Sequence, residues 1–199
     1  MKIAIIDYGA GNLNSVQRGF AYVGQQVRFT GDPGEIEAAD ALVLPGVGAF
    51  EACMRQVDPL KKVILERVDA GVPLLGICLG MQMFYEASEE NGRHEGLKIV
   101  PGTVSRFAGN LKVPHMGWNS LSIEKEHPLL KGIDKGSYVY FVHSYKANVN
   151  ACTVASSDYG GAFTAIVSND AGNAIGTQFH PEKSGPVGLK MLKNFAEMI

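Results

Sequence analysis

The sequence predicts a single α/β domain over residues 1–199, with a central, mostly parallel, mixed sheet flanked by helices and a β-rich second half. Three observations support this expectation. Short apolar runs alternate with helical patterns over the first 90 residues. From about residue 100 to residue 179, candidate strands outnumber candidate helices. No linker, repeat or low-complexity segment separates the two halves, so we expect them to share one core.

In the first half, each apolar run is expected to form a strand, at residues 3–6, 27–29, 41–44 and 72–77. Helical spacing of Val16, Phe20 and Val23 predicts a helix between the first two runs. A second helix is expected over residues 59–70, because Asp58 can cap it, Pro59 suits its first turn and Gly71 can end it. A third is expected over residues 81–87.

In the second half, six strands are expected, at residues 103–107, 120–123, 138–143, 153–156, 165–168 and 174–179. The chain closes with an amphipathic helix over residues 186–198. Its apolar stripe of Leu189, Leu192, Phe195 and Ile199 should pack on the sheet.

Composition excludes several classes of function. The chain has 18 Lys+Arg and 20 Asp+Glu, a net charge of −2, so neither a nucleic-acid footprint nor a polybasic membrane anchor is indicated. Its three cysteines, Cys53, Cys78 and Cys152, form no C-x-x-C pair, which favours a reducing compartment without a disulfide framework or zinc site. We therefore expect a cytoplasmic protein with no metal and no cofactor, in which Cys53 and Cys152 pack as small hydrophobes.

The segment Gly76-Ile77-Cys78-Leu79-Gly80 joins an expected strand to an expected helix and has the G-x-C-x-G form of a nucleophile elbow. Glycines on both sides remove the Cβ clashes of a sharp strand-to-helix turn and leave Cys78 exposed above the sheet. The helix dipole would favour its thiolate. From these five residues alone, a small buried cysteine remains an equally good interpretation.

Among five histidines, His180 is the strongest candidate for an acid–base partner of that cysteine. It ends an apolar strand, Pro181 blocks helical continuation, and the carboxylate of Glu182 could orient the imidazole. His94 and His127 lie in polar or turn-like surroundings and are expected to be structural. Cys78 and His180 both follow strands, where ligands bind in open α/β sheets.

A glycine-rich turn, Pro45-Gly46-Val47-Gly48, follows another expected strand. Its N–H groups could stabilise an oxyanion together with the backbone N–H of Leu79. A phosphate-binding loop is disfavoured, because no G-x-x-x-x-G-K-[ST] occurs and Asn14 replaces the third glycine of G-x-G-x-x-G.

Two of these segments, residues 76–82 (Gly-Ile-Cys-Leu-Gly-Met-Gln) and 178–184 (Gln-Phe-His-Pro-Glu-Lys-Ser), resemble the class I, triad-type glutamine amidotransferases, which have a flavodoxin-like fold. Four more resemble the glutaminase subunits of imidazole glycerol phosphate synthase from histidine biosynthesis, at residues 7–12, 44–50, 114–119 and 140–145. Glutaminases of pyridoxal phosphate synthase are the nearest sibling family, but they normally carry a Gly-Gly-Glu-Ser type turn where this chain has residues 45–48.

The resemblance implies that Cys78 attacks the side-chain amide of L-glutamine, that His180 transfers protons and that Glu182 orients His180. It assigns the oxyanion hole to the backbone N–H groups of Leu79 and of the turn formed by Gly46, Val47 and Gly48. It further implies a substrate pocket bordered by five residues, namely Pro45, Gln82, His143, Ser144 and Tyr145.

The resemblance also implies a partner, a (β/α)₈ cyclase subunit that uses the ammonia to make imidazole glycerol phosphate and an aminoimidazole carboxamide ribotide. A chain of 199 residues cannot contain that barrel as well. The expected interface residues are Asn12, Trp118, Asn119, Tyr138 and Lys183. Trp118 is the only tryptophan and is expected in a turn, which favours an interface anchor over a core residue.

Two alternatives from other classes stay open at this point. One is a non-catalytic domain of the same fold that binds and regulates a partner. The other is a cysteine hydrolase of another kind, such as a peptidase-like relative. Within the glutaminases, the pyridoxal phosphate sibling is the nearest competitor.

Overall fold

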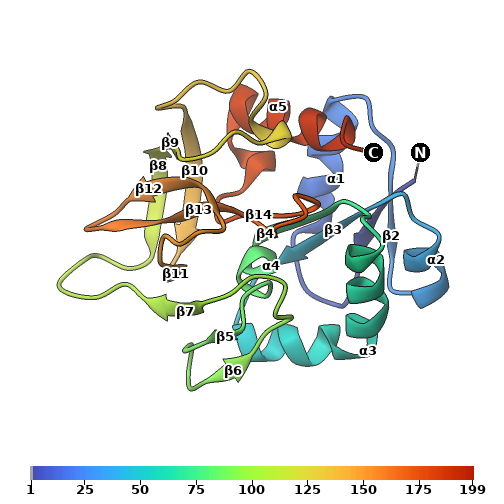
Figure 1. The fold of residues 1–199 in the computed structure, drawn as a ribbon, viewed down its shortest axis with the longest axis horizontal. Coiled ribbons are helices and arrows are strands. Elements are labelled where there is room, and N and C mark those ends of the chain that lie inside the picture. Colours follow the sequence, from blue (N-terminus) through green and yellow to red (C-terminus); the bar gives the residue numbers. More distant parts are fainter. Residues whose placement is uncertain (1) are drawn as a thin grey trace.

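The structure, a computed structural model, describes residues 2–199 and is built around an eight-stranded sheet (Figure 1). The strand order is β2-β1-β3-β4-β14-β13-β12-β9. The pairs from β2 to β14 are parallel and the remaining pairs are antiparallel. The strands are β1 (Ile3–Ile6), β2 (Val27–Thr30), β3 (Ala41–Gly46), β4 (Leu74–Cys78), β9 (Ser122–Ile123), β12 (Thr153–Asp158), β13 (Ala162–Ser168) and β14 (Ala174–Thr177). The expected mixed, mostly parallel sheet is confirmed, and both halves of the chain contribute strands to it.

Helices cover both faces of this sheet. Helices α1 (Leu13–Tyr22) and α5 (Gly185–Ala196) lie on one face, whereas α3 (Phe50–Asp69) lies on the other with the short α2 (Pro33–Glu37) beside it (Figure 1). Alternate residues of β1 therefore enter opposite cores: Ile3 and Ile5 pack with α1 and α5, and Ile6 packs with α3. Burial on both faces explains why these strands read as continuous apolar runs.

Two smaller sheets lie at the carboxyl edge of the parallel strands. Strands β8 (His115–Ser120) and β10 (Tyr138–His143) form an antiparallel pair. The other sheet has the order β11-β7-β5-β6. Its strands are β5 (Ala87–Ser88), β6 (His94–Glu95), β7 (Thr103–Arg106) and β11 (Tyr145–Ala147). Single 3₁₀ turns occupy Pro128–Leu130 and Pro181–Lys183. Trp118, expected in a turn, lies within β8, and the strand expected at residues 120–123 is divided between the end of β8 and β9.

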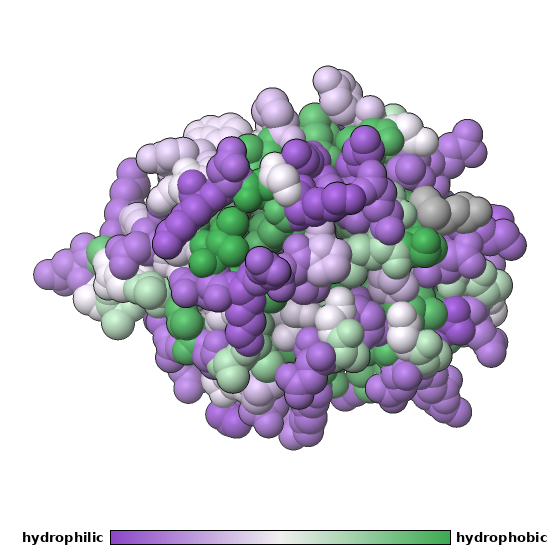
Figure 2. All heavy atoms as spheres, turned by 45° about the horizontal axis from the view of Figure 1, so that its top comes forward, coloured by the Kyte–Doolittle hydropathy of each residue, from purple (hydrophilic) through white to green (hydrophobic). Residues whose placement is uncertain are grey.

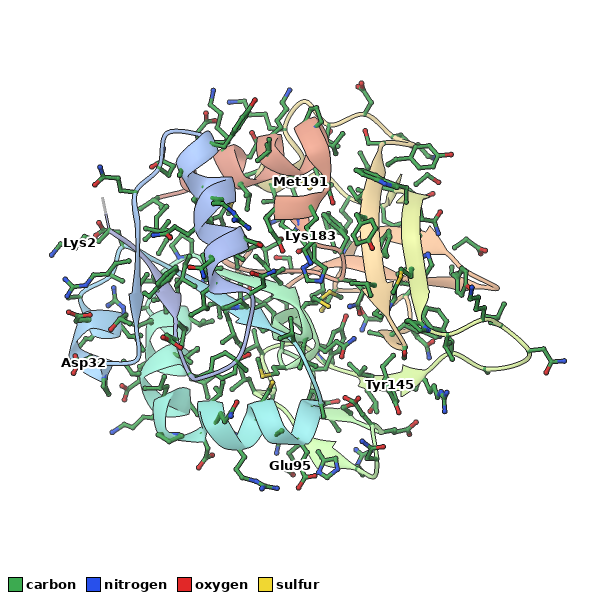
Figure 3. All side chains as sticks on the ribbon, turned by 180° about the vertical axis from the view of Figure 1, so that it is seen from behind. Lys2, Asp32, Glu95, Tyr145, Lys183 and Met191 are labelled. Atoms are coloured by element: carbon green, nitrogen blue, oxygen red, sulfur yellow. The ribbon has the colours of Figure 1, made fainter. Side chains whose placement is uncertain are left out.

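The helix expected to start at Pro59 begins instead at Phe50, and Asp58 is not its cap. Proline lacks the N–H that an interior helical position donates, so Pro59 looked like a first-turn residue. The helix continues through it because its stripe of apolar residues is buried against the sheet: Phe50, Cys53, Val57, Leu60, Ile64 and Val68. Figures 1 and 3 show the helix bending along its length, as a missing hydrogen bond allows.

The helix expected over residues 81–87 is wrong in length, because α4 covers only Leu79–Gln82. The following carbonyl groups are taken by a returning segment of the chain: Leu97 N–H donates to Met83, Ile99 N–H to Phe84 and Gly96 N–H to Glu86. These bonds replace the i to i+4 ladder and end the helix. The remaining expected strands, the first helix and the last helix are confirmed, with small shifts at their ends.

Replacing Gly80 tests how tightly the turn after β4 packs. A Cβ at this position would lie 1.9 Å from the carbonyl oxygen of Leu44 in β3, so Gly80→Ala should lower the free energy of unfolding by at least about 2 kcal/mol. Gly24→Ala is the control: Gly24 has φ +78° with open space around it, and should cost only about 1 kcal/mol of backbone strain. Urea denaturation measures both, and equal losses would contradict the predicted clash.

Candidate active site

A pocket of about 390 Å³ opens where β3, β4 and β14 end. It brings together most residues that the sequence singled out for catalysis or substrate binding, and two expected at an interface. Its lining comprises Asn12, Val47, Gly48, Cys78, Leu79, Gln82, Glu90, Pro114, Val142, His143, Ser144, Tyr145, His180 and Lys183. Pro45, Gly46 and Glu182 are not in this lining and support it from behind.

Cys78 lies at the turn between β4 and α4 with φ +56°, a conformation that is rare for a residue with a side chain. A Cβ on Gly76 would lie 2.7 Å from the Phe84 ring, and Gly80 packs against the Leu44 carbonyl. Glycine is therefore required on both sides of the cysteine, as the elbow pattern predicted. Because α4 has only four residues, its dipole is weaker than that of the longer helix we expected.

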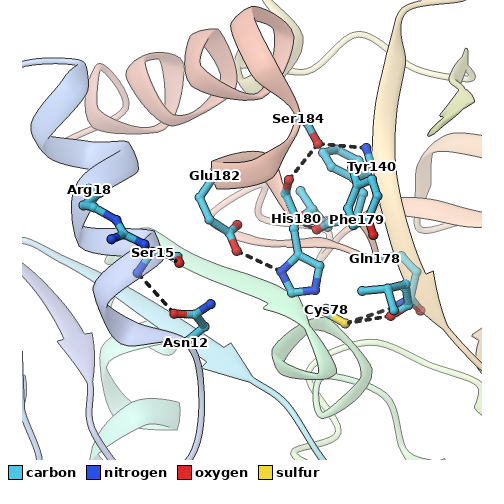
Figure 4. A network of polar contacts seen from close by, with 12 residues as sticks. Asn12, Ser15, Arg18, Cys78, Tyr140, Gln178, Phe179, His180, Glu182 and Ser184 are labelled. Carbon is cyan, nitrogen blue, oxygen red and sulfur yellow. Dashed lines mark hydrogen bonds and ion pairs between the residues drawn. The ribbon is translucent and has the colours of Figure 1, made fainter. Parts of the chain in front are cut away.

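His180 and Glu182 form a buried pair beside this cysteine (Figure 4). His180 Nδ1 lies 2.9 Å from Glu182 Oε1, and the side chains are 5% and 1% exposed. Burial opposes protonation, but hydrogen bonds with Cys78 and Glu182 and the charges of both groups outweigh it and raise the pKa of His180 to about 9. Since Nδ1–H donates to the carboxylate, Nε2 is the nitrogen left for Cys78.

Two glutamines form a polar wall next to Cys78. Gln82 Nε2 donates to the Tyr145 carbonyl and to Gln178 Oε1, each at 3.0 Å, and Gln178 Nε2 lies 3.9 Å from Cys78 Sγ. Gln82 is 5% exposed, which excludes a solvated helix residue. Sequence reasoning missed Gln178 as a site residue. The signal available was its spacing two residues before His180, which places both on one side of an extended chain.

The His143 ring contacts the same Tyr145 carbonyl that Gln82 binds. Nδ1 lies 2.8 Å from the Tyr145 carbonyl, and Nε2 lies 3.0 Å from Nδ1 of His115. A carbonyl only accepts, so His143 carries its proton on Nδ1 and accepts from the His115 N–H. Burial lowers the pKa of His143 to about 3, which keeps the ring neutral. His115 was not singled out by the sequence, although β8 and β10 pair it directly with His143.

The glycine-rich turn lies directly against the elbow. A Cβ on Gly46 would lie 2.7 Å from the Gly80 nitrogen, and the β3–β4 register places Gly46 opposite Cys78. Gly48 has φ +100°, which only glycine adopts readily, and lines the pocket with the half-exposed Val47. The backbone of this turn therefore faces the space above Cys78.

Glu90 is a further pocket residue that sequence reasoning missed. It is the single carboxylate in the lining, and its Oε2 accepts a hydrogen bond of 2.8 Å from the N–H of Phe50, the first residue of α3. No local motif marks it, because it reaches the pocket from the chain that returns after α4. It gives the pocket one carboxylate, which is held by the start of α3.

The expected interface residues occupy two places. Asn12 caps α1 and lines the pocket. Lys183 also lines the pocket and lies between α1 and β10 (Figure 3). Trp118 and Tyr138 are 56% and 60% exposed on the outer face of the β8–β10 pair. Asn119 points to the opposite face of β8, where its Nδ2 donates to the Asp158 carbonyl at 2.7 Å and contacts His115. It does not share a surface with Trp118.

Over residues 2–199, no group of three or more His, Cys, Asp and Glu side chains is placed to hold a metal ion. No helix in the same range is both long and apolar enough to cross a membrane.

Solved structures share this fold. A chain of the PurLQS structure from Thermotoga maritima superposes with a TM-score of 0.78 at 16% identity, covering 99% of this chain and 98% of that one. The glutaminase domain of Trypanosoma brucei CTPS, solved with bound acivicin, gives a TM-score of 0.70 at 18% identity, covering 99% and 94%. At such identities the likeness concerns the fold alone.

Sequence comparison gives the family. Residues 4–199 match the family described as glutamine amidotransferase class-I. The chain is 55% identical to the imidazole glycerol phosphate synthase subunit HisH of Methanosarcina acetivorans, over 99% of this chain and 98% of that protein. It is 52% identical to the HisH subunit of Syntrophotalea carbinolica, over 98% and 100%. The chain therefore belongs to the class-I glutamine amidotransferases, and within them to the family formed by the HisH subunits of imidazole glycerol phosphate synthase.

Proposed function

We propose that this chain is the glutaminase subunit of an imidazole glycerol phosphate synthase in histidine biosynthesis. It hydrolyses L-glutamine to glutamate and ammonia and passes the ammonia to a cyclase subunit. The observation that carries the proposal is the grouping of Cys78, His180 and Glu182 around one pocket, in a chain about half identical to HisH subunits along its whole length. The three cysteines are free, which supports a cytoplasmic location.

The first half-reaction forms a thioester. The Cys78 thiolate, paired with protonated His180, attacks the amide carbon of glutamine, and the carbonyl oxygen becomes an oxyanion. Backbone N–H groups of Leu79 and of the turn at Gly46, Val47 and Gly48 stabilise that charge. His180 gives its proton to the departing nitrogen, so ammonia leaves and a γ-glutamyl thioester remains on Cys78.

The second half-reaction regenerates the enzyme. Neutral His180 takes a proton from water, the resulting hydroxide attacks the thioester carbon, and the C–S bond breaks to release glutamate and the thiolate. Glu182 keeps the imidazole proton on Nδ1 throughout, so Nε2 is always the atom that exchanges protons with the substrate.

Recognition of the amino-acid end of glutamine falls to the other lining residues. Glu90 supplies a carboxylate for the α-ammonium group of the substrate. Gln82, Ser144 and Tyr145 supply amide and backbone groups for the α-carboxylate of the substrate. His143 holds the Tyr145 carbonyl in place. Pro45 supports the turn at the pocket edge.

The outer face of the β8–β10 pair is the proposed docking surface for the cyclase. The register places Met116, Trp118, Tyr138, Tyr140 and Val142 on this face, and the first three are more than half exposed. On the face of the molecule in Figure 2, hydrophilic side chains predominate and hydrophobic ones gather between them. The β8–β10 face instead carries three large exposed side chains close together, as surfaces that bind a partner often do. Val142 lines the pocket, so this face is continuous with the site that releases ammonia.

The alternatives now have less support. A purely regulatory domain has no need for the strained conformation of Cys78 or a buried histidine–carboxylate pair. A glutaminase of pyridoxal phosphate synthase is also disfavoured, because HisH subunits match this chain along nearly its whole length.

Ammonia release tests the assignment of the nucleophile. In the presence of the cyclase and its ribotide ligand, Cys78→Ala should lower glutamine hydrolysis at least about 1,000-fold, because no thioester can form. Cys152→Ala, which removes a half-buried cysteine outside the pocket, should retain wild-type activity. Wild-type activity that the cyclase leaves unchanged would contradict the partner, and an active Cys78→Ala protein would contradict the triad.

Stability against pH tests the His180–Glu182 pair. The pKa of His180 is about 9 in the folded protein and about 6.5 when unfolded, so the folded state binds the extra proton between these values. The stabilisation is complete below about pH 6.5 and is lost as pH rises through 9. We expect the free energy of unfolding to fall more steeply over this range in wild type than in Glu182→Gln, as urea denaturation can measure. Parallel curves would show that the pair does not raise the pKa of His180.

Cyclase affinity tests the docking face. Trp118→Ala should raise the Kd for the cyclase at least about tenfold, because a large exposed ring in an interface contributes strongly to binding. Tyr22→Ala is the matched control, since it removes an aromatic ring that is 78% exposed on α1, outside the β8–β10 face. Isothermal titration measures both. Equal effects of the two substitutions would place the cyclase elsewhere.

A further inference from the structure

We propose that Tyr8 and Cys53 are positioning residues of the glutaminase reaction, because they hold the two carbonyl groups on either side of the Gly46–Val47 peptide. The inference rests on the proposed function and adds to it two side chains that never touch the substrate. Neither residue lines the pocket, and neither belongs to the triad.

Tyr8 holds the start of the turn. It follows β1, its residue is only 8% exposed, and its hydroxyl donates a hydrogen bond of 2.5 Å to the Pro45 carbonyl. Burial raises the pKa of Tyr8 far above its usual value, so the hydroxyl keeps its proton and remains a donor. The contact joins the segment after β1 to the end of β3 across the carboxyl edge of the sheet.

Cys53 holds the Val47 carbonyl, two residues after Pro45. It lies in the first turns of α3, is 2% exposed, and its Sγ is 3.3 Å from the Val47 carbonyl oxygen. Burial raises the pKa of this thiol as well, which keeps it protonated and able to donate. The Tyr8 hydroxyl and the Cys53 thiol lie next to each other, so the two donors form one unit. Cys53 is thus more than the small hydrophobe expected from the sequence.

This unit is mounted on rigid parts of the fold. Helix α3 is buried along one face, and the N–H of its first residue, Phe50, donates a hydrogen bond to Glu90. Gly46 is held against the Gly80 backbone. Preorganised groups need such support, because a displacement of less than an ångström weakens a hydrogen bond to a developing charge.

The held carbonyls determine where the N–H groups of the turn point. A peptide unit is planar and trans, so its N–H is directed opposite to its C=O. With the Val47 carbonyl turned toward Cys53 in α3, the Gly48 N–H is directed away from α3, and Gly48 lines the pocket. The Gly46–Val47 peptide lies between the two held carbonyls and, over residues 2–199, receives no side-chain hydrogen bond of its own. Tyr8 and Cys53 thereby limit the turn to arrangements that offer N–H groups to the oxyanion.

Kinetics of the complete synthase, with cyclase and ribotide ligand present, test the proposal. Tyr8→Phe and Cys53→Ala should each lower kcat for glutamine hydrolysis about tenfold, or about 1.4 kcal/mol, and leave KM within about twofold. The reason for the split is that the turn binds a charge that exists only in the transition state. Cys53→Ser keeps a donor at the same place and should recover most of kcat.

Two controls separate positioning from general structure. Tyr159→Phe removes a comparable bond, from a tyrosine hydroxyl to the Lys112 carbonyl at 2.7 Å, outside the turn, and should leave kcat unchanged. Alkylation of Cys78 by iodoacetamide, followed by mass spectrometry, should proceed at the wild-type rate in Tyr8→Phe, since this reaction uses the thiolate and not the oxyanion site.

The outcomes that overturn the proposal are distinct from failure of the proposed function. Unchanged kcat in both variants, a rise in KM alone, or a Cys53→Ser protein as impaired as Cys53→Ala would each overturn it. If Cys53→Ala fails to fold, Tyr8→Phe decides the outcome by the same kcat and KM criteria. A wild-type synthase that releases no ammonia would instead overturn the proposed function, and this inference with it.

Discussion

The parallel pairing of β4 with β14 is the contact on which the site depends. It joins Gly76 to Gly176 and Ile77 to Thr177, although the two strands are separated by about half of the chain. Because both strands end at the same edge, Cys78 from one and His180 from the other meet above the sheet. Glycine at 176 is part of this arrangement, since a Cβ there would lie 2.6 Å from the Met81 side chain and displace α4.

Burial has opposite consequences for the two histidines of the site. Both lose hydration, which by itself favours the neutral ring. At His180, the hydrogen bonds and charges of Cys78 and Glu182 outweigh that loss. The hydrogen bonds of His143 go only to the Tyr145 carbonyl and to His115, and no carboxylate is among the groups that shift its pKa. One imidazole is therefore suited to carry a proton during the reaction, and the other serves as a neutral hydrogen-bonding bridge. The difference arises from one carboxylate and one thiol.

Two features meet at the carboxyl edge of the sheet. Its inner part contains the triad and the glycine-rich turn, and its outer part is the β8–β10 pair with Trp118 and Tyr138. Val142 belongs to both parts, because its strand has one face toward the core and the other toward solvent. The proposed docking surface and the proposed active-site pocket therefore share a wall.

The sequence by itself determined the features whose causes are local: the mixed sheet, the glycines around Cys78, the His180–Glu182 spacing and the glycine-rich turn. Strand periodicity and the backbone conformation of a sharp turn involve near neighbours, so they can be read from a short window. Tertiary contacts alone decided that α3 starts at Phe50, that α4 stops at Gln82 and that Trp118 lies in a strand. They also decided that Gln178, His115 and Glu90 belong to the site and that Tyr8 and Cys53 share the turn at residues 45–48. Each of these depends on atoms from residues far apart in the chain, whose approach is set by packing of the whole fold and leaves no local pattern.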